Sequence, residues 1–207
     1  MTTPRDLMIS ALDAAPGRPV MQGELSLALA GAELIDLLAA GAVALDGDRI
    51  LPGPPTGAAD PLADQAAASL VREAPYESVA DWLWRRGRGL ATAYLDALEA
   101  EGRLVWRRSH WRPFQDGRTA LADSPDRRRA ADRRASDEPV LAALVAAVGI
   151  RDEDAGNAGD AEDAVAGTGE AVQTVLAAVN DALMELAAVR QRRAIEQAAF
   201  DNIWRGA

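Results

Sequence analysis

The predicted fold rests on Leu29-Ala-Gly-Ala-Glu-Leu-Ile-Asp-Leu37 and on Gly41-Ala-Val-Ala-Leu-Asp-Gly-Asp-Arg-Ile-Leu51, which follows it. The first stretch belongs to a leucine-rich run that begins at Leu25 and whose apolar positions recur at helical spacing, so it predicts a helix that ends near Gly41. In the second stretch Asp46-Gly47 separates two short apolar runs, which is a strong signal for a two-residue β-hairpin turn. We therefore expect a helix followed by a small hairpin that ends at Pro52.

Helical patterns also dominate the rest of the chain. Apolar residues at spacings of three and four, with caps such as Ser78, predict further helices. The expected helical segments are Leu7 to Ala14, Leu62 to Glu73, Ser78 to Arg86, Gly89 to Glu101, a basic helix that starts within Asp123-Ser-Pro-Asp126, Pro139 to Val148, and a last helix from Glu170 to Val189. A second hairpin is expected over Leu104 to Leu121, turning near Asp116-Gly117. The fold class is therefore mainly α, a compact helical domain with two small β-hairpins.

The chain is expected to form a single domain over residues 1–207. Its 207 residues and 49% hydrophobic content suffice to bury a core. Residues 151–169 are acidic and rich in Gly and Ala, which predicts a flexible loop. Residues 190–207 form an amphipathic C-terminal tail beyond the strongest apolar stripe.

Composition excludes several classes of site. The chain has no cysteine, which excludes disulfides, thiolate catalysis and Cys-ligated metals, and allows a cytoplasmic setting. The N-terminal residues lack the pattern of a signal peptide, and no stretch approaches about 20 uncharged apolar residues. We therefore expect a cytoplasmic protein whose membrane contact is peripheral, with no cofactor and no metal.

The basic residues are segregated. All 22 are Arg, and 13 of them fall between Arg85 and Arg134 against seven acidic residues, a formal charge of +6 in a chain of net charge −10. Such a region can dock electrostatically on an anionic surface, where each Arg contributes on the order of 1 kcal/mol. The alternative is a solvated face whose arginines pair with the protein's own acids.

The second hairpin combines arginines with aromatic residues. This combination suits a surface that meets anionic groups and an apolar phase together, as at a phospholipid interface. The residues expected to form a membrane-contact hairpin are Trp106, Arg107, Arg108, Trp111 and Arg112. Two alternatives remain, because these aromatic side chains could instead pack onto the helices or form an oligomer interface.

No catalytic signature is present. His110 is the only histidine, it is surrounded by arginines, and no Ser or carboxylate spacing near it suggests a triad. The stretch from Asp152 to Asp163 has a superficial likeness to a calcium loop, but Gly156 and Asn157 depart from the EF-hand pattern. We therefore expect a protein that is not an enzyme.

The quoted stretches, together with Leu98-Glu-Ala-Glu-Gly-Arg-Leu-Val105 and Ala120-Leu-Ala-Asp123 before a basic helix, resemble the Golgi phosphoprotein 3 (GPP34) family in its bacterial branch. The likeness runs from about Leu7 to Val189. It implies a mainly helical peripheral membrane protein that binds phosphatidylinositol 4-phosphate, acts as an adaptor for a client protein, and is not an enzyme. In the family a hydrophobic hairpin assists membrane contact or self-association.

The resemblance also implies where a lipid headgroup would bind. The family's headgroup tryptophan and its partner arginine fall on Met21 and Ala30 of this chain. A later arginine pair, spaced i and i+3, falls on Arg88 and Ala91 when counted without gaps, or on Arg85 and Arg88 if the helix start shifts by one turn. Arg85 and Arg88 are therefore the expected headgroup-binding residues.

Three other readings stay open. A protein-interaction scaffold that has lost lipid recognition would account for Met21 and Ala30 at the headgroup positions. A winged-helix-like nucleic-acid binder would fit helices followed by a hairpin, but the acidic N-terminal part and the net charge of −10 oppose it, so we expect no nucleic-acid partner. The last apolar stripe, from Val172 to Val189, is either a core helix or, with its tail, a helix that joins copies into a homo-oligomer.

Overall fold

The computed structural model describes residues 2–14, 21–54, 57, 60–107, 118–121, 125–136, 138–150 and 167–205. Its elements, in chain order, are α1 (Thr3–Asp13), α2 (Gln22–Ala39), β1 (Val43–Asp46), β2 (Arg49–Pro52), α3 (Pro61–Ala68), α4 (Val79–Arg86), α5 (Leu90–Ala100), β3 (Leu104–Arg107), β4 (Arg118–Leu121), α6 (Pro125–Ala135), α7 (Pro139–Ala147) and α9 (Glu170–Arg205). The expectation of a mainly α protein with small antiparallel hairpins is confirmed.

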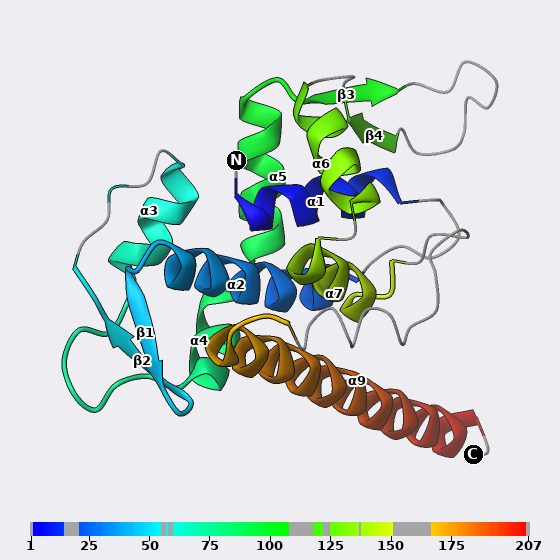
Figure 1. Cartoon of the computed structure of the whole chain (residues 1–207). Coiled ribbons are helices and arrows are strands. Elements are labelled where there is room, and N and C mark those ends of the chain that lie inside the picture. Colours follow the sequence, from blue (N-terminus) through cyan, green and yellow to red (C-terminus); the bar gives the residue numbers. More distant parts are fainter. Residues whose placement is uncertain are drawn as a thin grey trace.

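Helix α2 lies at the centre of the molecule, with α1, α4, α5 and α9 packed around it (Figure 1). A Cβ atom added to Gly31 would lie 2.4 Å from Cγ2 of Val179 in α9, so glycine allows these two helices to approach closely. The fully buried positions of the quoted helical stretch are Leu29, Ala30, Ala32 and Leu34. This stretch therefore forms the middle of the hydrophobic core, as its apolar spacing predicts.

The first hairpin forms where it was predicted, but its turn lies one residue later than Asp46-Gly47. β1 and β2 pair antiparallel with Asp46 opposite Arg49, so the two turn residues are Gly47 and Asp48, and Gly47 has φ 58°, the left-handed conformation that tight hairpin turns require. The hairpin is tied to the start of α4, because the Val79 N–H donates a 2.8 Å hydrogen bond to the carbonyl of Asp48. The hairpin thereby helps to position α4.

Helix α3 is shorter than the sequence pattern predicts, because it ends at Ala68 rather than near Glu73. At its start the Asp60 carboxylate accepts a hydrogen bond from the Leu62 N–H at 2.9 Å. At its end the Ser69 hydroxyl donates to the Ala66 carbonyl at 2.8 Å, and the next residue, Leu70, is buried in the core. Leu70 therefore packs into the core from a connecting segment instead of extending the helix.

The second hairpin is present where it was expected. β3 and β4 pair antiparallel, with Leu104 opposite Leu121 and Arg107 opposite Arg118. Residues 108–117, which contain most of the expected membrane-contact hairpin, lie outside the described residues.

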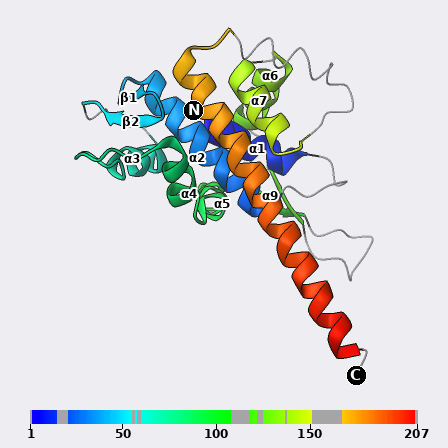
Figure 2. The same cartoon turned by 90° about the horizontal axis from the view of Figure 1, so that it is seen from below.

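Helix α9 has two parts with different surroundings. Its first part packs on α2, α4 and α7, with Val175 and Val179 fully buried, and its last part extends away from the rest of the molecule (Figure 2). By length and composition alone, its Glu170–Phe200 portion could cross a membrane, because it contains an 18-residue window with a mean hydropathy of 1.4. A core helix meets the same criterion, and we assign the first part to the core because its apolar stripe is buried against α2.

Candidate anion-binding site

A tight turn joins α4 to α5 and carries Arg88 between two glycines. A Cβ atom on Gly87 would lie 2.5 Å from the carbonyl oxygen of Leu83 and 3.3 Å from that of Ser26, so the turn passes close to α2. Gly89 has φ 69°, a left-handed conformation that glycine adopts without strain. The turn therefore requires its glycines and presents Arg88, which is exposed, next to the N-terminal part of α2.

A shallow pocket of about 310 Å³ lies between this turn and α2. The turn and the first residues of α5 form one wall, α2 forms another, and Leu186 of α9 closes one side. The lining residues are Gln22, Gly23, Ser26, Leu27, Trp84, Gly87, Arg88, Gly89, Thr92 and Leu186. The pocket is lined by polar groups that can hydrogen-bond to a ligand, by one cation, and by no carboxylate among the described residues.

The pocket lies at the N-terminus of α5. The first backbone N–H groups of a helix lack intrahelical partners and carry partial positive charge. Gly89 supplies no side-chain cap here, and the hydroxyl of Ser26 in α2 instead accepts a 3.0 Å hydrogen bond from the Ala91 N–H. Gln22 donates to the Thr92 hydroxyl at 2.6 Å, which joins the two walls. The arrangement favours a negatively charged ligand.

The two arginines expected to share a headgroup site have different surroundings. Arg88 lines the pocket and makes no hydrogen bond or ion pair with a described residue. Arg85 donates to both carboxylate oxygens of Glu77 at 2.6 Å and to the Ser69 carbonyl at 3.1 Å, and it stacks over Trp82 at 5.3 Å. The hydrogen bonds to Glu77 raise the pKa of the Arg85 guanidinium. Arg85 thus joins α4 to the segment before it and does not line the pocket.

The other positions indicated by the resemblance differ from one another in how deeply they are buried. Met21 is half exposed at the start of α2, where its sulfur accepts a 3.1 Å contact from Arg190. Ala30 is fully buried, and its carbonyl accepts a 3.0 Å hydrogen bond from the Trp82 indole N–H. Ala91 is also buried. Both alanine positions therefore belong to the core of this chain.

The expected membrane-contact residues are only partly described. Trp106 and Arg107 lie in β3, where Trp106 is opposite Thr119. Arg108, Trp111 and Arg112 lie outside the described residues. Their contact with a membrane therefore stays a prediction.

Most of the described arginines in the basic region pair with the protein's own acids. Arg86 binds Glu33, and Arg127 binds Asp13 at 2.7 Å. Arg133 binds Asp6 and Glu138. These acids lie outside the basic stretch of the sequence, so the segregation of charge along the chain does not persist at the surface. Among the described residues, Arg88 is the arginine that lines a pocket without an ion pair to one of the protein's own acids, so it can bind an anionic ligand there.

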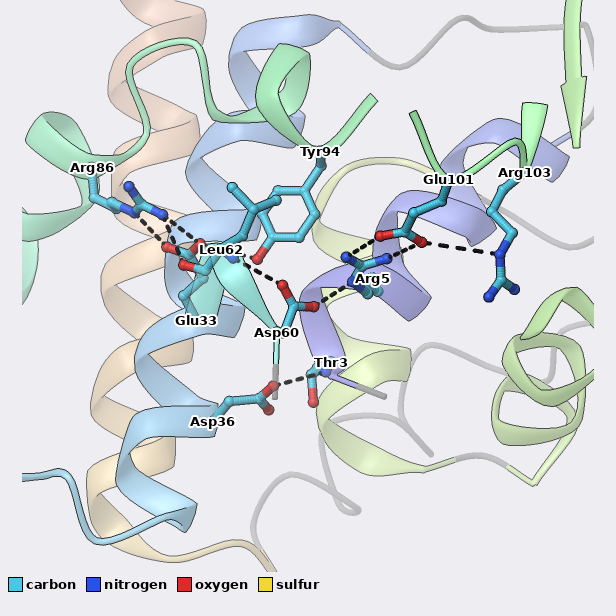
Figure 3. A network of polar contacts seen from close by, with 10 residues as sticks. All are labelled: Thr3, Arg5, Glu33, Asp36, Asp60, Leu62, Arg86, Tyr94, Glu101 and Arg103. Carbon is cyan, nitrogen blue, oxygen red and sulfur yellow. Dashed lines mark hydrogen bonds and ion pairs between the residues drawn. The ribbon is translucent and has the colours of Figure 1, made fainter. Parts of the chain in front are cut away.

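A buried polar network lies farther along α2, around Glu33 (Figure 3). Glu33 accepts hydrogen bonds from Arg86 and from the Tyr94 hydroxyl, and its burial raises the pKa of its carboxyl. Arg5 pairs with Asp60 and with both oxygens of Glu101. The network joins the helices to one another.

A larger cavity of about 510 Å³ borders this network. Its charged groups already have partners in the chain: Asp36 accepts from the Thr3 N–H at 2.9 Å, Glu33 binds Arg86, and Arg133 binds Asp6. Two of these lining groups are carboxylates, which oppose an anion. The smaller pocket at Arg88 is therefore the better candidate site for an anionic ligand.

Sequence reasoning identified Arg88 but missed the rest of the pocket. Ser26, Gln22 and Thr92 carry no sequence signal for binding, because they meet only through the packing of α5 on α2. The available signal was Gly87-Arg88-Gly89, in which two glycines flank a cation at the start of a helix.

Comparison with known proteins agrees with this architecture. The family description Golgi phosphoprotein 3 (GPP34) matches residues 4–186, which is most of the chain. No curated protein matches it. On the strength of a match that spans α1 to the middle of α9, the chain belongs to the Golgi phosphoprotein 3 (GPP34) family.

Proposed function

We propose that this protein is a peripheral membrane module that binds the phosphate of an anionic lipid headgroup at Arg88. The observation that carries the proposal is an arginine, in a pocket at the N-terminus of α5, that makes no ion pair with any residue of the described part of the chain. Membership of a family of lipid-binding adaptors supports it, and so does the absence of carboxylates among the described lining residues. The proposed activity is binding rather than catalysis.

The chemistry of the pocket suits a phosphate group. A guanidinium presents parallel N–H donors that match two phosphate oxygens, and it stays charged at any physiological pH. The N-terminus of α5 adds backbone dipoles aimed at the same region. A volume of about 310 Å³ is at the lower end for small-molecule sites, so it suits a phosphate with part of its headgroup rather than a whole lipid.

We infer that phosphatidylinositol 4-phosphate is the first headgroup to test, because the family resemblance implies it. Only one of the arginines indicated by the resemblance lines the pocket, since Arg85 is held by Glu77 and the remaining positions are Met21, Ala30 and Ala91. A single guanidinium supports weaker discrimination between headgroups than a cluster does. We therefore expect binding that depends on negative charge, with a modest preference for a phosphorylated headgroup.

The test is cosedimentation of the purified chain with liposomes that contain phosphatidylinositol 4-phosphate, phosphatidylinositol, phosphatidylserine or neutral lipid only. Hydrogen bonds to charged groups contribute about 1.5–3 kcal/mol, so Arg88→Ala should weaken binding at least about tenfold. Arg72→Ala is the matched control, because Arg72 is exposed, has the same charge, and lies outside the pocket. Equal losses in both variants, or no binding by the wild type at low salt, would contradict the proposal.

A protein-interaction scaffold is the second candidate. The observation that favours it is the internal pairing of Arg85, Arg86, Arg127 and Arg133, which leaves less free positive charge than the sequence suggests. It predicts that no liposome composition sediments the protein. The same experiment therefore decides between the two.

A further inference from the structure

The C-terminal part of α9 leaves the body of the molecule. The family match ends at residue 186, whereas α9 continues to Arg205. Every residue from 191 to 200 is exposed, and Figures 1 and 2 both show this part extending into open space. We call residues 187–205 the α9 extension. At about 1.5 Å per residue it is about 28 Å long.

The positions of the buried stripe of α9 can be followed into the extension at the same spacing, where charged residues stand between apolar ones. Positions spaced alternately by three and four residues lie on one side of a helix and form the seam of a coiled coil. In the body this series contains Val172, Val175, Val179 and Ala182, which face α2 and its neighbours. In the extension the same series contains Val189, Arg193, Glu196, Phe200 and Ile203. The seam therefore passes from the core to a part of the helix that projects from the body.

The order of residues along this seam is self-complementary. If two copies pair antiparallel about a two-fold axis between residues 194 and 195, Arg193 of each copy faces Glu196 of the other. The same axis places Val189 opposite Phe200. One apolar layer would then flank the pair of salt bridges on each side, which is an isologous contact. Parallel pairing would instead place Arg193 against Arg193.

The exposure and ion pairing of Arg193 and Glu196 within a single copy fit this antiparallel arrangement. Arg193 and Glu196 are exposed, and neither makes an ion pair with a described residue. Phe200 is 57% exposed, a large fraction for an aromatic side chain in a helix. At the base of the extension, Arg190 binds Glu24 of α2 at 2.5 Å, which holds the direction of the helix relative to the body. The extension is thus anchored at one end and exposed to solvent from residue 191 to residue 200.

We propose that the α9 extension is a homodimerisation helix, which pairs antiparallel with the extension of a second copy of this chain through Val189, Arg193, Glu196 and Phe200. The proposal does not depend on lipid binding at Arg88. It places the end of the partner's extension beside Leu186, which lines the Arg88 pocket, so each pocket would have the second copy as a neighbour.

The test is sedimentation velocity of the full-length chain over a concentration series. The wild type should approach twice the 21.8 kDa of one chain as its concentration rises. Arg193→Glu and Glu196→Arg should each remain monomeric, because each places like charges against one another. The double variant Arg193→Glu/Glu196→Arg restores both salt bridges and should dimerise again. A monomeric wild type, dimeric single variants or a monomeric double variant would each overturn the proposal.

Ile195→Glu is the matched control. Ile195 is 62% exposed but lies roughly 160° around the helix from Arg193, away from the seam. Its substitution should leave the dimer intact, and dissociation by Ile195→Glu without dissociation by Arg193→Glu would show that a different face is used. All these positions are exposed, so circular dichroism and thermal unfolding of each variant should match the wild type.

Orientation has a separate test, because the chain has no cysteine of its own. Copies carrying Val189→Cys, mixed with copies carrying Phe200→Cys, should form a disulfide-linked dimer under mild oxidation. Copies carrying Val189→Cys alone should not cross-link. Efficient cross-linking of Val189→Cys alone would indicate parallel pairing and overturn the antiparallel arrangement.

Discussion

Glu33 and Arg86 form a two-pronged ion pair in the interior of the protein. The Nε and Nη2 atoms of Arg86 donate to the two carboxylate oxygens of Glu33 at 2.7 and 2.9 Å, and the Glu33 side chain is 1% exposed. The Tyr94 hydroxyl donates to the same carboxylate at 3.0 Å. One buried carboxylate of α2 thus holds α4 and α5, the two helices joined by the turn that carries Arg88.

Arg86→Met should destabilise the protein strongly. Removing one partner of a buried ion pair leaves an uncompensated charge, which costs about 3–5 kcal/mol. Urea unfolding would measure this loss, and the double variant Glu33→Gln/Arg86→Met should lose less than the sum of the two single variants. Arg72→Met, at an exposed position, should change stability by less than about 0.5 kcal/mol. A similar small loss for Arg86→Met would show that the buried pair contributes little.

Asp36→Asn should become more stable relative to the wild type as pH rises. Burial raises the pKa of Asp36 above its ordinary value of 3.8, although the Thr3 N–H donates to its carboxylate. A raised folded-state pKa contributes stability that is complete below the unfolded pKa and is lost as pH rises through the folded pKa. Asparagine keeps an acceptor for Thr3 but does not ionise, so it avoids this loss.

The measurement is the free energy of unfolding of both proteins in urea, from about pH 4 to about pH 7. The difference in favour of Asp36→Asn should grow across this range. Asp96→Asn makes the same change of charge at an exposed position of α5 and serves as the control. A difference that stays constant or reverses with pH would mean that ionisation of Asp36 does not oppose folding.

Gly31→Ala should destabilise the contact between α2 and α9. The added methyl group would lie 2.4 Å from Cγ2 of Val179, a distance that requires the helices or the valine to move. Overpacking of this kind typically costs about 1–3 kcal/mol. The double variant Gly31→Ala/Val179→Ala removes the clash and should recover part of the loss, measured as the midpoint of thermal unfolding. No recovery in the double variant would place the cause elsewhere than at Val179.

Local sequence patterns predicted the helices and hairpins well where short-range physics decides them. The leucine-rich helix of α2 and the Asp46-Gly47 hairpin follow from periodicity and turn chemistry, which act over a few residues. The end of α3 was predicted wrongly, because Leu70 continues the helical pattern but packs into the core from a connecting segment. Apolar periodicity shows which residues would share one face of a helix, but it does not show whether the backbone stays helical through them.

The candidate site was less predictable for a similar reason. The sequence pointed to Arg85 and Arg88 together, but Glu77 holds Arg85 and only Arg88 lines the pocket. Besides the residues next to Arg88, the pocket is lined by residues of α2 and α9, more than 50 residues away in the chain. No local pattern encodes such partners, because they meet only when the helices pack.

What the sequence by itself determined is the family, the helical class, the presence of the first hairpin and the seam of α9, since each depends on residue order over short spans. Only the tertiary structure decided which arginines are neutralised, because the acids that bind Arg86, Arg127 and Arg133 include partners 53 to 127 residues away. It also placed Ala30 and Ala91 in the core and exposed the α9 extension. The physical reason is that charge pairing and burial depend on distances in space, which chain order fixes only within an element.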